Sequence, residues 1–113
     1  MRRTQMWISV KDLKYMDEIS IRTQNSMYRF RVTDPKKCKG LLSGGLLGET
    51  QHEASLCSEV TTDNQQPTFC ARLEIGRCAF FYVYVRESLR RLTTSEIFDV
   101  SLTRIPTQVS TEC

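Results

Sequence analysis

Apolar and polar residues alternate one by one along two neighbouring segments in the first third of the chain. In 19–22 isoleucine alternates with serine and arginine, and in 28–32 tyrosine, phenylalanine and valine alternate with two arginines. A period of two places one set of side chains on a buried face and the other in solvent. Asn25 lies between the segments, and asparagine tolerates the left-handed backbone of tight turns. The pattern predicts a β-hairpin with an apolar inner face and an arginine-bearing outer face.

The alternation returns in the last third of the chain, where it predicts further strands. Residues 69–75 alternate apolar side chains with Cys, Arg and Glu, and Gly76-Arg77 follows as a bend. The segment 78–85 is the most hydrophobic run and is rich in aromatic and β-branched residues, so we expect a central strand covered on both faces. Two short strands follow at 89–93 and 98–102, the latter with Phe98, Val100 and Leu102 on one face.

The middle of the chain predicts turns rather than long elements. Asp34-Pro35 is typical of a type I turn, because proline has the φ angle which that turn needs. A third strand over 38–43 is weakened by Gly40, and the glycines that follow it at 44, 45 and 48 indicate a sharp corner. Residues 49–68 are mostly polar, so we expect a long polar loop there, with a short helix over 50–58 as the alternative.

These elements predict an all-β protein of six to seven short strands with at most one short helix. The pattern favours a small antiparallel β-barrel, SH3-like or similar, and the alternative is a two-sheet β-sandwich. A chain of 113 residues is long enough for one domain. Within it we expect an N-terminal arm or first strand at 1–14, the β core at 15–103, the polar loop at 49–68 and a flexible tail at 104–113.

Cysteine usage and hydropathy predict a cytoplasmic protein without a membrane segment. The five cysteines are an odd number at irregular spacings, which is typical of reduced thiols rather than of a disulfide framework. No apolar run approaches the roughly 18 residues that cross a membrane. The N-terminal segment is too broken for a signal-peptide core, because Lys11 and Asp12 interrupt it.

No motif in the sequence predicts catalysis, a metal site or a cofactor. A structural zinc site normally has closely spaced ligand pairs, and no Cys-x-x-Cys pair is present. His52 is the only histidine, so a cysteine nucleophile would need it beside Cys38, Cys57 or Cys70. The glycines of 41–49 lack the Gly-Lys-Ser/Thr ending of a phosphate loop. We therefore expect a protein that is not an enzyme.

Positive charge is concentrated in the first part of the chain, although the net charge is only +3. Residues 1–40 hold ten Lys and Arg against four Asp and Glu, whereas residues 41–113 hold six against nine. Tyr28 and Phe30 lie opposite the hairpin arginines, so the basic face lacks the aromatic platform on which bases stack. Nucleic-acid binding is therefore the alternative function. Its candidate residues are Arg22, Arg29, Arg31, Lys36, Lys37 and Lys39.

The hydrophobic run at 78–85 leads to the favoured function. Its two alternating faces cannot both point into one small core, so one face needs a cover from the 49–68 loop, a ligand or a second subunit. Isologous pairing is the commonest arrangement of oligomers, so we expect a homodimer. The sequence thus predicts a non-enzymatic binding or protein-interaction module that self-associates. The candidate residues are Phe80, Phe81, Tyr82, Val83 and Tyr84.

Overall fold

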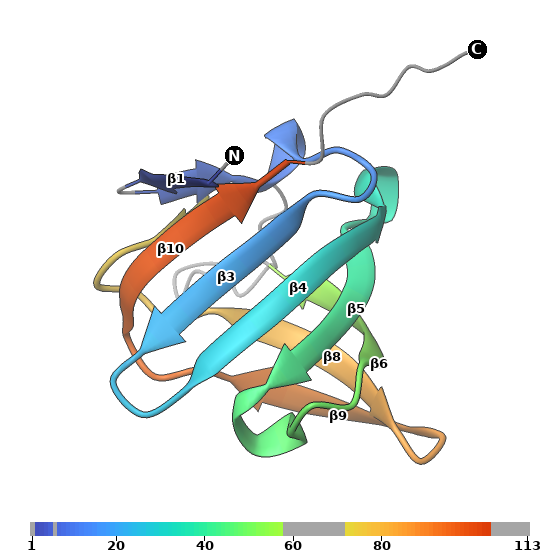
Figure 1. Ribbon diagram of the computed structural model, residues 1–113. Helices are drawn as coiled ribbons and strands as arrows, with labels where there is room; N and C mark the ends of the chain where they lie inside the picture. The colour runs from blue at the N-terminus through green and yellow to red at the C-terminus, as the bar shows by residue number, and fades with distance from the viewer. Residues whose placement is uncertain (1, 6, 58–71, 105–113) are drawn as a thin grey trace, which may run out of the picture.

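The computed structural model describes residues 2–5, 7–57 and 72–104, and within them the protein is almost entirely β-structure (Figure 1). The described residues contain no α-helix and only three short 3₁₀ turns, η1 (Val10–Asp12), η2 (Pro35–Lys37) and η3 (Gly45–Leu47). The strands are β1 (Arg2–Gln5), β2 (Trp7–Ser9), β3 (Glu18–Thr23), β4 (Met27–Asp34), β5 (Lys39–Gly44), β6 (His52–Cys57), β7 (Arg72–Glu74), β8 (Phe80–Val85), β9 (Ser88–Thr93) and β10 (Ile97–Thr103). The predicted all-β class is confirmed, but six to seven strands was too few, because β1 has only four residues and β6 carries little apolar signal of its own.

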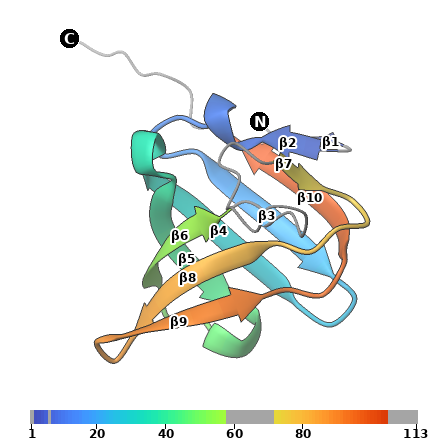
Figure 2. The same ribbon diagram turned by 180° about the vertical axis from the view of Figure 1, so that it is seen from behind.

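Eight of the strands form one antiparallel sheet in the order β1-β10-β3-β4-β5-β6-β8-β9, and β2 pairs with β7 in a separate small sheet. The large sheet curls, so that β8 and β9 run behind β3 and β4 (Figures 1 and 2). The curl brings Phe30 of β4 and Phe81 of β8 together, with ring centroids 5.4 Å apart, although two strands separate β4 from β8 in the sheet. The core therefore lies inside the curl.

Within the described residues the sheet does not close into a complete barrel, because β1 and β9 each pair with only one strand. The connection between β7 and β8 partly spans the gap. The Gly76 amide donates to the Ile97 carbonyl and the Ile97 amide donates to the Arg77 carbonyl, both at 2.9 Å. The small sheet adds Ile8 and Leu73 to the core and lies beside the end of β10 (Figure 2).

The first predicted hairpin is confirmed as β3 and β4, with Ile19 opposite Phe30 and Ile21 opposite Tyr28 on the buried side. Our reason for its turn was wrong, because no residue of the turn has a positive φ angle. Thr23 holds the turn instead. Its amide donates to the Ser26 carbonyl at 2.8 Å, and its hydroxyl oxygen accepts from the Ser26 amide at 3.1 Å.

The predicted polar loop at 49–68 is wrong for its first part, because residues 52–57 form β6 between β5 and β8. The alternative of a helix over 50–58 is wrong for the same residues. Ala54 and Leu56 face the core, and hydrogen bonding to strands on both sides stabilises a segment whose apolar signal is only two residues. Residues 58–68 of the predicted loop lie outside the described residues.

In β10 the structure corrects the expectation that Phe98 shares one face with Val100. A β-bulge between Ile97 and Asp99 shifts the alternation by one residue, so Ile97 is buried and Phe98 is 58% exposed. Val100 keeps its predicted place in the core. Bulges of this kind turn one side chain away from a sheet without ending the strand, and simple alternation cannot foresee them.

Arg104, the last described residue, is held by Asp17, which directly precedes β3. This carboxylate is 1% exposed and accepts hydrogen bonds from Arg104 at 3.0 Å to Oδ1 and 2.9 Å to Oδ2, and from the Lys14 amide at 2.8 Å. The Arg104 guanidinium also donates to the Asp12 carbonyl. The predicted tail therefore begins from an anchored residue, and 105–113 lie outside the described residues. The segment 1–14 holds β1, β2 and η1. None of the described helical segments is long and apolar enough to cross a membrane.

Candidate functional site

The solvent side of the large sheet, which we call the outer face, carries two surfaces with unusual composition. Alternation places Phe81 and Val83 of β8 in the core, so their neighbours on the same strand point outward. We call the outward side chains of Phe80, Tyr82 and Tyr84, together with Leu89 opposite Tyr84 on β9, the aromatic row. Tyr82 is 43% exposed, Tyr84 51% and Leu89 56%, so the row is open to solvent.

The structure divides the residues predicted for self-association into two groups. Phe81 and Val83 are 0% and 1% exposed and belong to the core, so they cannot contact a partner directly. Phe80, Tyr82 and Tyr84 remain available on the outer face. The expected second cover of the hydrophobic run is absent from the described part of the chain, because both tyrosines stay exposed there.

One cation lies beside the aromatic row on the neighbouring strand β9, and a second lies two strands away on β5. The Arg91 guanidinium lies over the Phe80 ring at 5.7 Å from its centroid, a distance typical of a cation–π interaction. Tyr82 stands opposite Arg91 on β9 and opposite Ser55 on β6, and Ser55 stands opposite Lys39. The outer face here thus combines the tyrosine and arginine side chains that are enriched in protein interfaces.

Cys57 ends β6 beside the aromatic row, opposite Phe80. Burial raises the pKa of its thiol above the ordinary value, and this outweighs the lowering by a backbone hydrogen bond at Tyr82 and by the Arg91 charge. The position therefore favours a neutral, weakly reactive thiol at neutral pH.

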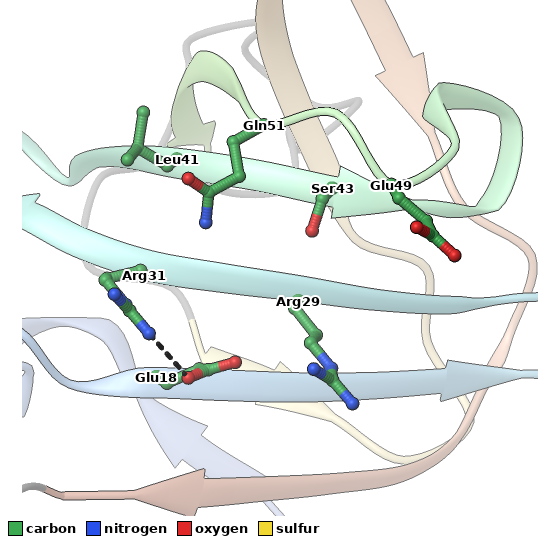
Figure 3. Close-up of a pocket in the computed structure, with 7 residues that line it drawn as sticks. All are labelled: Glu18, Arg29, Arg31, Leu41, Ser43, Glu49 and Gln51. Atoms are coloured by element: carbon green, nitrogen blue, oxygen red, sulfur yellow. Dashed lines mark hydrogen bonds and ion pairs between the residues drawn. The ribbon is translucent and has the colours of Figure 1, made fainter.

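The second surface is a polar depression of about 420 Å³ on the outer face of β3, β4 and β5 (Figure 3). We call it the outer depression. The connection between η3 and β6 forms one wall of the depression. The glycine corner at 44–48 turns this connection back toward the sheet, and the Gly44 amide donates to the Gly48 carbonyl within the corner. A Cβ at Gly45, where φ is +53°, would collide with the Tyr28 ring, so this corner needs glycine. The lining residues are Glu18, Arg29, Arg31, Leu41, Ser43, Glu49 and Gln51.

One ion pair crosses the outer depression, between Arg31 Nη2 and Glu18 Oε1 at 3.3 Å (Figure 3). The Arg31 Nε atom is buried and has no hydrogen-bond partner in the structure. Arg29 is exposed, and it forms no ion pair or hydrogen bond with another described side chain. The depression thus holds one neutralised arginine and one arginine whose charge is not balanced by a contact.

The predicted basic patch is only partly assembled. Arg29 and Arg31 share the outer depression, and Arg22 lies on the outer face of the adjacent strand β3. Lys39 begins β5, whereas Lys36 and Lys37 lie on the η2 turn beyond the strands. Acidic residues stand between these cations, so the six residues do not form one uniformly positive surface.

The residues considered for cysteine catalysis are not brought together. His52 stands opposite Leu42 on the core side of β6, while Cys57 is five residues further along the same strand on the outer side, or about 17 Å away. Cys38 lies at the Cys57 end, where its carbonyl accepts from the Leu56 amide. Cys70 lies outside the described residues. Among the residues that the structure describes, no group of three His, Cys, Asp or Glu side chains could hold a metal ion.

Sequence reasoning missed the residues that reach these surfaces through strand pairing. Leu89 joins the aromatic row, and Arg91 lies beside it, only because β9 pairs with β8. Ser43 stands opposite Arg29 through the pairing of β4 with β5, and the glycine corner brings Glu49 and Gln51 to the same depression. The glycines were the available signal, since they marked a corner. Comparison with protein-family models, with curated proteins and with solved structures gave no match.

Proposed function

We propose that the protein is a non-enzymatic binding module that self-associates through the aromatic row. The observation that carries the proposal is the solvent exposure of Tyr82, Tyr84 and Leu89 on one side of a two-stranded segment. Tyrosine and arginine are enriched among the residues that carry most of the binding energy in protein interfaces, and an aromatic ring buries a large area. A second copy that presents the same row would bury both sets of aromatic side chains.

The proposal also includes a finer description of the fold and a location. We classify the curled sheet as a partly open β-barrel of SH3-like or similar type, supported by the Phe30–Phe81 contact across its interior and by the hydrogen bonds at Ile97. A cytoplasmic location is in keeping with the thiols of Cys57 and Cys78, which form no disulfide.

The oligomeric state tests the proposed self-association. Size-exclusion chromatography with light scattering should give a dimer for the wild-type chain and a monomer for Tyr82→Arg combined with Tyr84→Arg. Tyr15→Arg is the matched control, because Tyr15 is also exposed but does not belong to the row. A wild-type monomer at every concentration measured, or a dimer that survives the double substitution, would contradict the proposal.

Nucleic-acid binding is the second candidate, favoured by Lys39 and Arg91 on either side of Tyr82 on the outer face. Single strands bind where bases stack on aromatic rings and phosphates meet cations. Fluorescence anisotropy with a single-stranded oligonucleotide should then show binding that weakens steeply with salt. Arg91→Glu should abolish it, and so should Arg29→Glu with Arg31→Glu. Arg90→Glu is the control, because Arg90 stands opposite the core residue Val83. Salt-independent or absent binding would exclude this candidate.

A further inference from the structure

The outer depression contains hydrogen-bond donors whose acceptors are missing from the described residues. Arg31 Nε is buried without a partner, and Arg29, Ser43 and Gln51 form no hydrogen bond through their side chains with a described residue. The Arg31 Nε atom has almost no accessible surface, so it is not a donor that a ligand reaches, whereas the other three side chains are open to the depression. An acceptor that enters the depression can reach Arg29, Ser43 and Gln51, because none of these three residues is buried.

The charges in the depression restrict what that acceptor can be. The Arg31–Glu18 ion pair is neutral as a unit, and Arg29 carries the positive charge that has no contact to balance it. Glu18 and Glu49 also line the depression, so a dianion such as phosphate would meet two negative charges. A monoanion has only one charge to accommodate, and the planar fork of an arginine matches the two oxygens of a carboxylate.

We propose that the outer depression binds one carboxylate group, with Arg29 as its main partner and Ser43 and Gln51 as further donors. Its volume of about 420 Å³ exceeds that of a carboxylate alone, so the group belongs to a larger molecule. That molecule is either a small carboxylic acid or a polypeptide that presents an acidic side chain. The depression shares no residue with the aromatic row, so this inference does not depend on the proposed self-association.

Backbone amide chemical shifts measured by NMR test the proposal. Sodium acetate and the blocked tripeptide acetyl-Ala-Glu-Ala-amide are titrated separately into the ¹⁵N-labelled protein, with sodium chloride at the same ionic strength as reference. Saturating shifts are expected for residues around Arg29, Ser43 and Gln51. Arg29→Gln should reduce the affinity at least tenfold, while Arg22→Gln, which removes an exposed cation outside the depression, should leave it unchanged.

The two probes distinguish the source of the carboxylate. Equal affinities support recognition of the carboxylate alone, as for a small acid, and tighter binding of the peptide supports an acidic side chain of a partner. Inorganic phosphate should bind more weakly than acetate, because of Glu18 and Glu49. Gln51→Glu is a second variant that should abolish binding by adding a third carboxylate. Shifts no larger than those with sodium chloride, or shifts that persist in Arg29→Gln, would overturn the proposal.

Discussion

The hairpins β3–β4 and β8–β9 are built on the same pattern but have opposite relations to solvent. Both place alternate residues in the core, where Phe30 of the first meets Phe81 of the second. The first hairpin lies inside the sheet, between β10 and β5, and its outer face carries charged and small polar residues together with Met27. The second ends the sheet, and its outer face carries the aromatic row. The first hairpin thus differs from the second, which leaves apolar area exposed to solvent.

The largest expected effect on stability concerns the contact between Phe30 and Phe81, which joins the two hairpins in the core. Phe30→Ala and Phe81→Ala should each lower the free energy of unfolding by about 3–5 kcal/mol, because both rings are fully buried. Urea denaturation measures this, and the double variant should reveal a coupling of about 0.5–1.5 kcal/mol for the ring pair. Tyr82→Ala is the control on the outer face and should cost much less. Equal costs for Phe81 and Tyr82 would contradict the assignment of the two faces. The milder Phe81→Leu serves if the alanine variants do not fold.

The second prediction concerns the ion pair between Asp17 and Arg104, which lies at the start of the first hairpin and has no counterpart described in the second. Arg104→Met should destabilise the protein by about 3 kcal/mol, since it leaves the buried Asp17 carboxylate without its cation. Arg31→Met breaks the more exposed pair with Glu18 and should cost less than about 1 kcal/mol. Thermal or urea unfolding compares the two variants. An Arg104→Met cost no greater than that of Arg31→Met would show that the buried pair does not anchor β3.

The third prediction compares the turns. Arg86 and Glu87 both adopt positive φ angles, 51° and 67°, in the two-residue turn of β8–β9. Replacing them by Asn and Gly, which tolerate this backbone, should stabilise the protein by about 1–2 kcal/mol. Asn25→Gly in the first hairpin should bring no gain, because its turn contains no left-handed residue. Differential scanning calorimetry measures both variants. A gain at Asn25 equal to that at Arg86 and Glu87 would contradict the described turn geometries.

The smallest expected effect concerns Cys57, beside the aromatic row. Because burial raises its thiol pKa, the folded protein holds this proton more tightly than the unfolded chain. Its stabilising contribution is therefore complete below the ordinary thiol pKa and is lost as the pH rises through the raised value. Alkylation of Cys57 by iodoacetamide, followed by peptide mapping, should have its midpoint above that of a free thiol. Arg91→Gln should move it higher still, since the Arg91 charge lowers the pKa. A midpoint below the free-thiol value would contradict the described burial.

The sequence predicted elements whose signal is local. Alternation at Ile19, Ile21 and Phe30 defined the first hairpin, and the glycines after 43 marked the corner that shapes the outer depression. β6 was missed because its stability comes from strands on both sides rather than from its own composition. Phe98 was misplaced because a bulge changes the alternation without a sequence signature.

The candidate surfaces were predictable only in part, because they also depend on contacts between segments that are distant in the sequence. Tyr82 and Tyr84 could be named from the hydrophobic run, but which face of that run is buried depends on the curl of the whole sheet. Arg29 could be named from the hairpin, yet Gln51 reaches it only after the chain has turned through η3. Residues that are distant in sequence become neighbours through strand order, and strand order is a property of the folded chain.

The place of β10 has a consequence for biosynthesis. This late strand lies between β1 and β3, so the two earliest strands of the large sheet have no shared neighbour until Ile97–Thr103 have left the ribosome. Until then β3 has an edge whose backbone hydrogen bonds to β10 cannot form. We therefore expect the native sheet to form after translation of β10 rather than step by step during synthesis.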